Sequence, residues 1–320
     1  MQKLLVIGSI NMDFVIRTES LPRPGETTIG GKFCQISGGK GANQAVAAAR
    51  GGCVAVRLLA ALGDDDMGRA LLKQYGSEDQ LSLDLVHKID DGVTGVATIL
   101  VDSSGENMIC VAPGANAHLQ PAQVRAVTDE VFEDSGVLLA SNEIPLETVA
   151  ACIRRATLAG LRIILNPAPV LPELADHPLL KSVDLLTPNE HEARLLSGIE
   201  VTDVASAIAS ARVLQQMGVE CVIITLGSQG VVVIPREGQS DPWCVQAPQV
   251  VALDTTAAGD CFNGLLAAEL AQGQDLKQAV EFAVHGASLS VSCRGAQSSL
   301  PTRPEILQFI RGETEQTLPG

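Results

Sequence analysis

Residues 250–264 read VVALDTTAAGDCFNG, and a helical pattern then continues to Leu270. The apolar residues 250–253 predict a strand, and the small residues after them predict a loop that leads into a helix. Ala257, Ala258 and Gly259 would let backbone N–H groups approach a ligand closely, and a helix N-terminus adds partial positive charge. Such a strand–loop–helix unit is typical of α/β proteins. Here it predicts an anion hole for a phosphoryl group.

Asp260 lies in the first turn of this predicted helix. Its carboxylate could take a proton from an attacking hydroxyl, as a general base does in phosphoryl transfer. It could equally well complement the helix dipole, because acidic residues are common in first turns. From this segment alone the two interpretations have equal weight.

The rest of the chain alternates short apolar runs with longer helical patterns. We expect strands at Lys3–Ile7, Val137–Leu139, Arg162–Leu165, Val183–Leu186 and Cys221–Thr225. We expect helices at Ala42–Arg50, Leu146–Leu158, Glu190–Leu196 and Val204–Met217, with Gly51 and Gly52 ending the first. Near-continuous apolar strands that alternate with helices predict a mostly parallel sheet with helices on both faces, which is a three-layer αβα fold.

Two regions, 14–36 and 95–111, depart from this rhythm because their apolar residues alternate with a period of two. They contain turn signals such as Pro24-Gly25 and Ser103-Ser104-Gly105. The alternation predicts antiparallel hairpins with one polar face exposed to solvent. We expect a small appended sheet that could cover a cleft as a lid or form an oligomer contact. Edge strands of the main sheet would give the same pattern.

Three other segments place polar residues beside glycines or strand ends. SGGKGANQ at 37–44 is a glycine-rich turn before a helix, although the chain has neither a Walker A sequence nor G-x-G-x-x-G. TLGSQG at 225–230 follows a strand, and ligands of open α/β sheets bind at the carboxyl ends of strands. TPNEHE at 187–192 puts Asn189 and Glu192 on one helical face, where their oxygens suit a hydrated magnesium ion. An N-cap at Asn189 with Glu192 completing a capping box explains the same spacing.

Composition narrows the function classes. The 320 residues carry a formal net charge of −15 and no dense Lys/Arg run, so we do not expect a nucleic-acid partner. The apolar runs are far shorter than the about 20 residues that span a bilayer, and we see no signal-peptide pattern. We therefore expect a cytoplasmic protein without membrane association. The 8 cysteines and 5 histidines lack metal-ligand spacing and predict reduced thiols rather than disulfides or a zinc site.

Taken together, these segments resemble the ribokinase-like (phosphofructokinase-B-type) carbohydrate kinases over nearly the whole chain. Two signatures carry the resemblance, GGKGANQA at 38–45 and DTTAAGDCFNG at 254–264. Many members have glycine at the position of Ala257, and alanine there is similar to the ribokinase branch. The resemblance implies one kinase domain over residues 1–312, with a β lid formed from about 14–36 and 95–111. We expect residues 313–320 to be a flexible tail.

The resemblance also implies the activity and the site. It implies ATP-dependent phosphorylation of the 5-hydroxyl of ribose, with Asp260 as catalytic base and an anion hole of backbone amides at Ala257, Ala258, Gly259 and Asp260. The implied sugar-binding residues are Asn11, Asp13, Gly39, Lys40, Asn43, Glu143 and Asp260. The implied ATP-binding residues are Asn189, Thr225, Leu226, Gly227, Ser228, Gln229, Gly230, Gly259 and Asp260. An adenine-contacting position that is often Asn or His is Val284 here, with His285 next to it.

Metal ions and a partner subunit follow from the same resemblance. Glu192 completes an N-x-x-E motif that binds magnesium through water. Potassium is implied beside the anion hole, at Asp254, Thr256, Ser290, Cys293, Gly295 and Ser299. Asp254 could instead only cap its turn, and Gly295 could simply end a helix. We also expect a homodimer formed through the lid.

The residue types in the sugar set suit a neutral polyol, because amides and carboxylates exchange hydrogen bonds with hydroxyls. A phosphorylated sugar would need several Arg or Lys side chains, and Lys40 is the only cation in the set. Kinases of deoxyribose, fructose, adenosine or pseudouridine are alternatives within the family. The aromatic content of 2% argues weakly against a base-stacking nucleoside pocket. A non-catalytic sugar-binding protein would be expected to lack Asp260 or Gly259, and both are present.

Overall fold

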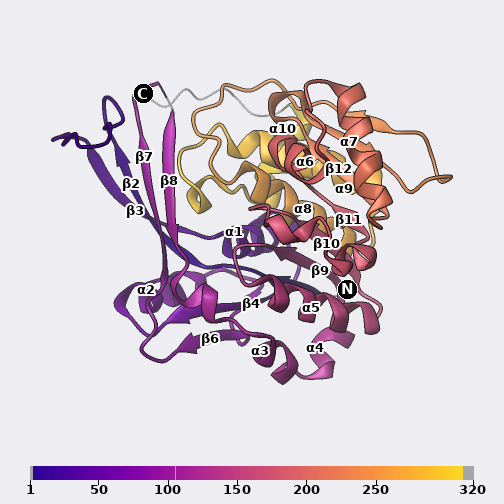
Figure 1. The fold of residues 1–320 in the computed structure, drawn as a ribbon, viewed down its shortest axis with the longest axis horizontal. Coiled ribbons are helices and arrows are strands. Elements are labelled where there is room, and N and C mark those ends of the chain that lie inside the picture. The colour runs from indigo at the N-terminus through magenta and orange to yellow at the C-terminus, as the bar shows by residue number, and fades with distance from the viewer. Residues whose placement is uncertain (1–2, 105, 313–320) are drawn as a thin grey trace.

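The computed structural model describes residues 3–104 and 106–312 and is built around one large sheet (Figure 1). The strands lie in the order β14, β13, β12, β11, β10, β9, β1, β4 and β5, and β6 also pairs with β4. Their bounds are β1 (Lys3–Ile7), β4 (Val56–Gly63), β5 (Leu81–Ser82), β6 (Val86–Ile89), β9 (Ser135–Ser141), β10 (Arg162–Asn166), β11 (Leu185–Leu186), β12 (Cys221–Thr225), β13 (Val231–Ile234) and β14 (Trp243–Val245). Among the described residues of this sheet, only the β12–β13 and β13–β14 pairings are antiparallel. The prediction of a mostly parallel sheet is therefore confirmed.

Helices cover both faces of this sheet. They are α1 (Lys40–Ala47), α2 (Asp66–Tyr75), α3 (Pro121–Ala126), α4 (Asp129–Glu133), α5 (Leu146–Leu158), α6 (Glu190–Ser197), α7 (Val204–Gln216), α8 (Ala258–Ala271), α9 (Leu276–Ser290) and α10 (Arg303–Arg311). Alternate residues of β1 point to opposite faces, so Leu4 and Val6 pack with α1, α8 and α9, whereas Leu5 and Ile7 pack with α5 and α7. These two cores confirm the three-layer αβα fold.

The position of β1 in the sheet determines where a ligand would bind. From β1, the chain reaches β4 on one side, and β9 and the later strands extend the sheet on the other. Open α/β sheets bind ligands beyond the carboxyl ends of the strands where this order reverses. The turns after β1 and β9 are therefore expected to carry site residues.

A separate four-stranded sheet contains the two regions with period-two alternation. Its strands, in the order β3, β2, β7 and β8, extend to one side of the main body in Figure 1. Their bounds are β2 (Asn11–Arg17), β3 (Lys32–Gly38), β7 (Gly95–Val101) and β8 (Asn107–Ala112). The β2–β3 and β7–β8 hairpins are antiparallel as predicted, but β2 and β7 join them through a parallel pairing. The expectation of edge strands in the main sheet is thereby excluded.

The expectation of one polar face on this small sheet is wrong. Register places Phe33, Ile16, Leu100 and Met108 in one row across the four strands. The next row, on the opposite face, contains Cys34, Val15, Ile99 and Ile109. The second row lines a cavity of about 490 Å³ against the 252–256 and 294–298 loops. The first row leaves Phe33 and Met108 more than half exposed, at 59% and 53%.

Several local predictions need correction. Residues 250–253 form no strand, because the backbone N–H of Leu253 donates to the carbonyl of Val291 at the end of α9 rather than to a neighbouring strand. The helix expected at 42–50 begins at Lys40, and its last turn is the π-helix η1 (Ala48–Gly52). The expected tail at 313–320 lies outside the described residues.

Within residues 3–104 and 106–312, no helix is long and apolar enough to cross a membrane.

Candidate active site

The first turn of α8 places Asp260 at the centre of the site. Ala257, the residue before the helix, has a left-handed backbone with φ of 61° and turns the chain sharply into α8. The N–H of Ala258 donates to the carbonyl of Thr255 at 3.3 Å, so one of the predicted anion-hole amides already has a partner. A side chain built on Gly259 would meet no protein atom within 4 Å, so the space in front of this residue is open to a ligand.

Two amides from α1 hold the Asp260 carboxylate. Asn43 Nδ2 donates to Oδ2 at 2.9 Å and Gln44 Nε2 donates to Oδ1 at 3.0 Å, which fixes the orientation of the carboxylate. Burial raises the pKa of Asp260, the nearby Glu143 raises it further, and Lys40 and the two amides oppose the rise. A carboxylate with a raised pKa and a fixed orientation is suited to accept a proton. This geometry supports the general-base interpretation of Asp260 more than the helix-dipole interpretation.

Behind Gln44 a series of hydrogen bonds returns to α8. Gln44 Nε2 also donates to Asn166 Oδ1 at 3.1 Å, and Asn166 Nδ2 donates to the carbonyl of Thr187 at 3.1 Å. Thr187 Oγ1 donates to Asn263 Oδ1 at 2.6 Å, and Asn263 Nδ2 donates to the carbonyl of Gly259 at 2.8 Å. We did not predict these residues as site residues. Gln44 and Asn263 lie within the two signatures, Asn166 is the last residue of β10, and Thr187 follows β11. Polar residues at the carboxyl ends of strands are the sequence signal that could have identified Asn166 and Thr187.

The predicted sugar residues come together where β1, β2, β9 and α1 meet. Glu143 Oε2 accepts from Ser9 Oγ at 2.5 Å and from the backbone N–H of Lys40 at 3.2 Å. Asn11 Oδ1 accepts from Asn116 Nδ2 at 2.8 Å, which leaves the Asn11 amide nitrogen for a ligand. Because these residues come from four elements, the fold rather than local sequence assembles the set.

Two glycines of the 38–45 signature make this assembly possible. A side chain on Gly38 would lie 2.0 Å from Asp13 Oδ2, so the Asp13 carboxylate packs directly over this residue. Gly39 has φ of 90° and its added Cβ would lie 2.7 Å from the backbone N of Asn11. Both positions therefore require glycine for steric reasons.

Charge in this group is unbalanced, since one lysine lies among four carboxylates. Burial acts to lower the pKa of Lys40, but the surrounding carboxylates together raise it above its ordinary value. These carboxylates are Asp260, Glu143, Glu192 and Asp13. Burial, with Glu143 and Asp260, raises the pKa of Asp13 to about 7. Among the described residues, Asp13 Oδ1 and both amide atoms of Asn142 are buried without a hydrogen-bond partner. Buried polar atoms without partners in these elements are suited to a polyhydroxylated ligand.

A second cavity, of about 260 Å³, is lined in part by Ala258 and Gly259 at the start of α8. Thr225, Gly227, Ser228 and Gly230 contribute to its wall, whereas Leu226 packs into the core and Gln229 is exposed. Val284 also lines the cavity. Its neighbour His285 is directed away, with Nδ1 2.7 Å from the carbonyl of Glu281 and its ring at the edge of Phe309. A mostly apolar cavity of this kind is suited to the base of a nucleotide.

Asn189 and Glu192 begin α6 with a capping box. Asn189 Oδ1 accepts from the N–H of Glu192 at 2.8 Å, and Glu192 Oε2 accepts from the N–H of Asn189 at 3.0 Å. The capping interpretation of this spacing is therefore realised. Burial raises the pKa of Glu192, Lys40 lowers it and Asp260 raises it, so this carboxylate also interacts with the central charges. Capping and a water-mediated magnesium contact are compatible, because a carboxylate has about four lone-pair sites.

The residues expected around potassium lie in two adjoining loops. Asp254 Oδ1 accepts from Thr256 N at 3.1 Å and from Thr256 Oγ1 at 2.6 Å, so Asp254 does cap its turn. Asp254 Oδ2 accepts from the N–H of Gly295 at 3.1 Å and from Arg17 of β2 at 3.0 Å. Although burial acts to raise the pKa of Asp254, these hydrogen bonds and Arg17 hold it below its ordinary value.

Other residues of the potassium set use their polar groups locally. The N–H of Cys293 donates to the carbonyl of Ser290 at 3.1 Å, and Ser299 Oγ donates to the carbonyl of Ala296 at 2.7 Å. In the part of the chain that the structure describes, no group of three or more His, Cys, Asp and Glu side chains could hold a metal ion. A potassium site here would thus depend on backbone carbonyls.

Comparison with known proteins agrees with this geometry. The family model described as pfkB family carbohydrate kinase matches residues 1–303. A ribokinase of Haemophilus influenzae is 41% identical over 312 residues, covering 96% of this chain and 98% of the relative. The ribokinase structure of Thermotoga maritima has a TM-score of 0.85 and 34% identity, covering 97% of this chain and 100% of that chain. The Arabidopsis thaliana ribokinase complexed with ribose and ATP has a TM-score of 0.84 and 29% identity, covering 97% and 99%. This chain belongs to the pfkB family of carbohydrate kinases.

Proposed function

We propose that this chain is an ATP-dependent kinase that phosphorylates ribose on its 5-hydroxyl. One observation carries the proposal, namely that the neighbouring residues Gly259 and Asp260 contact two different parts of the site. Gly259 lines the apolar cavity suited to a nucleotide, whereas the Asp260 carboxylate contacts α1 beside the polar group suited to a sugar. A sugar hydroxyl next to Asp260 would thus lie close to the terminal phosphate of a nucleotide at the start of α8. The ribokinase relatives favour ribose as the sugar.

The chemical step that we infer is an in-line displacement. Asp260 takes the proton of the 5-hydroxyl, the oxygen forms a bond to the γ-phosphorus, and the bond from phosphorus to the β–γ bridging oxygen breaks to release ADP. Asn43 and Gln44 keep the Asp260 carboxylate in one orientation during this transfer. The amide-bearing start of α8 stabilises charge on the transferred group.

The polar group around Lys40 fits a neutral sugar better than a charged one. Asp13 and Glu143 accept hydrogen bonds from hydroxyls, and the Asn11 amide nitrogen donates one. A sugar phosphate would be repelled by the surplus of carboxylates around Lys40, the one cation in the set. The preference for ribose over deoxyribose, fructose or a nucleoside is part of the proposal.

Magnesium and potassium belong to the proposal as well. Glu192, through water, would hold the magnesium ion of the nucleotide, which neutralises charge on the phosphates when bound. Backbone carbonyls of the 254–256 and 290–299 loops would hold potassium, and Asp254 already joins these loops through Gly295. The wholly hydrogen-bonded Asp254 carboxylate suits a role in shaping the loops rather than in direct ligation.

The small sheet is proposed as a lid and as a dimer contact. Its Cys34–Val15–Ile99–Ile109 row lines the cavity above the 252–256 loop, where a lid would cover a bound sugar. The opposite row from Phe33 to Met108 is apolar and partly exposed, as expected of a surface that a second copy covers. Eight free thiols in the described residues favour a reducing compartment, so we place the enzyme in the cytoplasm.

A coupled assay of ADP release tests the proposed activity. The panel contains ribose, deoxyribose, fructose, adenosine and pseudouridine, with Asp260→Asn as the inactive control. We expect kcat/KM for ribose to exceed the others by at least about tenfold, since a lost hydroxyl contact weakens transition-state binding. Equal or higher kcat/KM for another compound would replace ribose as the substrate, and no ADP release with any of them would contradict the kinase function.

A further inference from the structure

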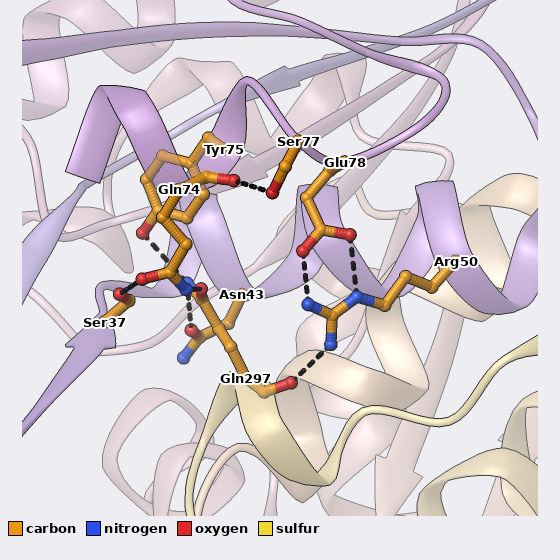
Figure 2. A network of polar contacts seen from close by, with 8 residues as sticks. All are labelled: Ser37, Asn43, Arg50, Gln74, Tyr75, Ser77, Glu78 and Gln297. Atoms are coloured by element: carbon orange, nitrogen blue, oxygen red, sulfur yellow. Dashed lines mark hydrogen bonds and ion pairs between the residues drawn. The ribbon is translucent and has the colours of Figure 1, made fainter. Parts of the chain in front are cut away.

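A buried network lies behind Asp260 and contains Gln297, a residue that the sequence did not single out. Gln297 begins the short helix η6 (Gln297–Ser299), and only 3% of it is exposed. Its Nε2 donates to Asn43 Oδ1 at 3.1 Å and to the Tyr75 hydroxyl at 2.9 Å (Figure 2). Gln297 thus contacts the same Asn43 side chain whose Nδ2 holds Asp260.

Four hydrogen bonds of this network form a series that runs in one direction, from Ser37 to Asp260. Ser37 Oγ, at the end of β3, donates to Gln74 Oε1 at 2.6 Å, and Gln74 Nε2 donates to Gln297 Oε1 at 3.4 Å. Gln297 Nε2 then donates to Asn43 Oδ1, and Asn43 Nδ2 donates to Asp260 Oδ2. Each amide accepts through its oxygen and donates through its nitrogen, so the orientation of each determines the orientation of the next.

Gln297 is itself held firmly. Its backbone carbonyl accepts from Arg50 Nη1 at 2.6 Å, and Arg50 Nε donates to Glu78 Oε2 at 2.7 Å (Figure 2). Tyr75 is fully buried and fills the space beside the amide. An amide anchored by its backbone and packed by an aromatic ring can hold a second amide in one rotamer, as positioned catalytic groups require.

We propose that Gln297 is a positioning residue for phosphoryl transfer, which fixes the Asn43 amide so that Asn43 in turn orients the Asp260 carboxylate. The inference rests on the proposed kinase function. Without the Gln297 donor, Asn43 Oδ1 loses its partner and the Asn43 amide is free to rotate. Asp260 then keeps only the bond from Gln44 and points less consistently at the substrate hydroxyl.

The hydrogen-bond series also links two parts of the fold that are distant in the sequence. Ser37 belongs to β3 of the small sheet, whereas Gln297 begins η6, two residues after Gly295. The series therefore connects the base of the small sheet to the catalytic carboxylate, and Ser37, Gln74 and Gln297 lie outside the sugar and nucleotide sets. A purely structural role would explain the burial of Gln297 but would not require its donor to point at Asn43.

The test compares Gln297→Met with Tyr75→Phe. The methionine variant keeps the length of the side chain and removes the donor to Asn43, whereas the phenylalanine variant removes a different buried bond of Gln297 and leaves the Asn43 contact. We expect Gln297→Met to lower kcat about 10- to 100-fold, with KM for ATP changed less than about twofold. Tyr75→Phe should lower the melting temperature but leave kcat within about twofold of wild type. Gln297→Leu, which also removes the donor to Asn43 and adds no charge beside Asp260, is a second variant in case Gln297→Met folds poorly.

A readout independent of turnover is the titration of the Asp260 carboxyl carbon by NMR with ¹³C-labelled aspartate, assigned by its loss in Asp260→Asn. Among the described residues, the charged groups that interact with Asp260 are Lys40 of α1, Asp13 of β2, Glu143 after β9 and Glu192 of α6, and all remain in Gln297→Met and Tyr75→Phe. Gln297→Met loosens the Asn43 amide, and a weaker hydrogen bond from Asn43 to Asp260 should move the Asp260 midpoint upward, whereas Tyr75→Phe should leave it unchanged.

The outcomes separate the two hypotheses. Unchanged kcat and an unchanged Asp260 midpoint in Gln297→Met would overturn the positioning role and leave Gln297 as a structural residue. If the wild-type protein phosphorylates no sugar, the proposed function is wrong, and the NMR comparison alone decides whether Gln297 orients Asp260. A lower kcat with a shifted midpoint in Gln297→Met, absent from Tyr75→Phe, establishes the role.

Discussion

Replacing Asp13 with asparagine should make the sugar-free protein more stable at alkaline pH while it weakens sugar binding. The Asp13 carboxylate is buried, and burial with the nearby Glu143 and Asp260 raises its pKa from 3.8 to about 7. A pKa that is higher in the folded state means that folding favours the protonated form. Stability is therefore lost as the pH rises from about 4 to about 7, and it stays reduced above that range.

The size of the effect follows from the shift. About three pKa units at about 1.4 kcal/mol each give a folding penalty of about 4 kcal/mol above pH 7. At pH 5 the same linkage leaves a penalty of about 1.7 kcal/mol. Asp13→Asn removes the ionisation but buries an amide, whose own cost of about 1–3 kcal/mol does not depend on pH. The decisive quantity is thus the change in the variant-minus-wild-type difference between pH 5 and pH 8, expected at about 2.5 kcal/mol.

Urea unfolding followed by the fluorescence of the single tryptophan, Trp243, measures this difference. Ribose at about 100 times its Kd should add about 2.7 kcal/mol to the wild-type protein and clearly less to Asp13→Asn, because the carboxylate accepts a sugar hydroxyl. A difference between the two proteins that is the same at pH 5 and pH 8 would refute the raised pKa. Equal stabilisation of both proteins by ribose would refute the sugar contact.

Three further substitutions address the chemistry, the potassium loops and the dimer. Asp260→Asn should keep the fold and sugar binding and lower kcat about 10²–10⁴-fold, and more than about a third of wild-type kcat would exclude Asp260 as the base. Activity should rise as potassium goes from zero to about 100 mM at fixed ionic strength, and Asp254→Ala should abolish the rise, whereas a flat wild-type response argues against the ion. Phe33→Glu should convert a dimer into a monomer in light scattering, whereas the control Leu158→Glu, at another exposed apolar residue, should leave the dimer intact. A monomeric wild-type protein would contradict the proposed dimer contact.

The strands and helices of the three layers were predicted well because a segment that buries one face must repeat its apolar residues with the period of its own secondary structure. Lys3–Ile7, Cys221–Thr225 and Leu146–Leu158 have the predicted bounds, since each is a continuous or amphipathic run whose period fits one element only. Residues 250–253 misled for the same reason. Their apolar run resembles a buried strand, but Val251 is 74% exposed and Leu253 is 46% exposed. The segment is hydrogen-bonded to Val291, at the C-terminal end of α9, and not to a neighbouring strand.

Contacts between segments that are distant in the chain could not be predicted from the sequence alone. The parallel β2–β7 pairing joins two hairpins that are about eighty residues apart, and no local pattern specifies which strands meet. The register between neighbouring strands determines which apolar residues lie side by side on each face of the small sheet. The sequence of a single strand does not specify this register. These features needed the tertiary structure.

Within the site, the residues inside a signature were predictable, but the residues that hold them in place through hydrogen bonds were not. Asp260 and Asn43 stand in the two quoted motifs, so the resemblance located them. Asn166, Thr187 and Gln297 act only through hydrogen bonds to other side chains. A buried amide in a sequence looks the same whether it satisfies its own loop or orients a catalytic carboxylate, and only the partner atoms distinguish the two.

The charge of the site gives a physical reason for a neutral acceptor and an anionic donor to occupy separate places. Lys40 is surrounded by Asp260, Glu143, Glu192 and Asp13, so the sugar side has surplus negative charge in the absence of ligand. A neutral polyol can bind there because its hydroxyls donate to carboxylates without adding charge. The phosphates of the donor instead meet the amide-bearing start of α8, where the helix field is favourable for anions. Asp260 lies at the boundary between the two regions, which is where the proton must leave the acceptor as the phosphoryl group arrives.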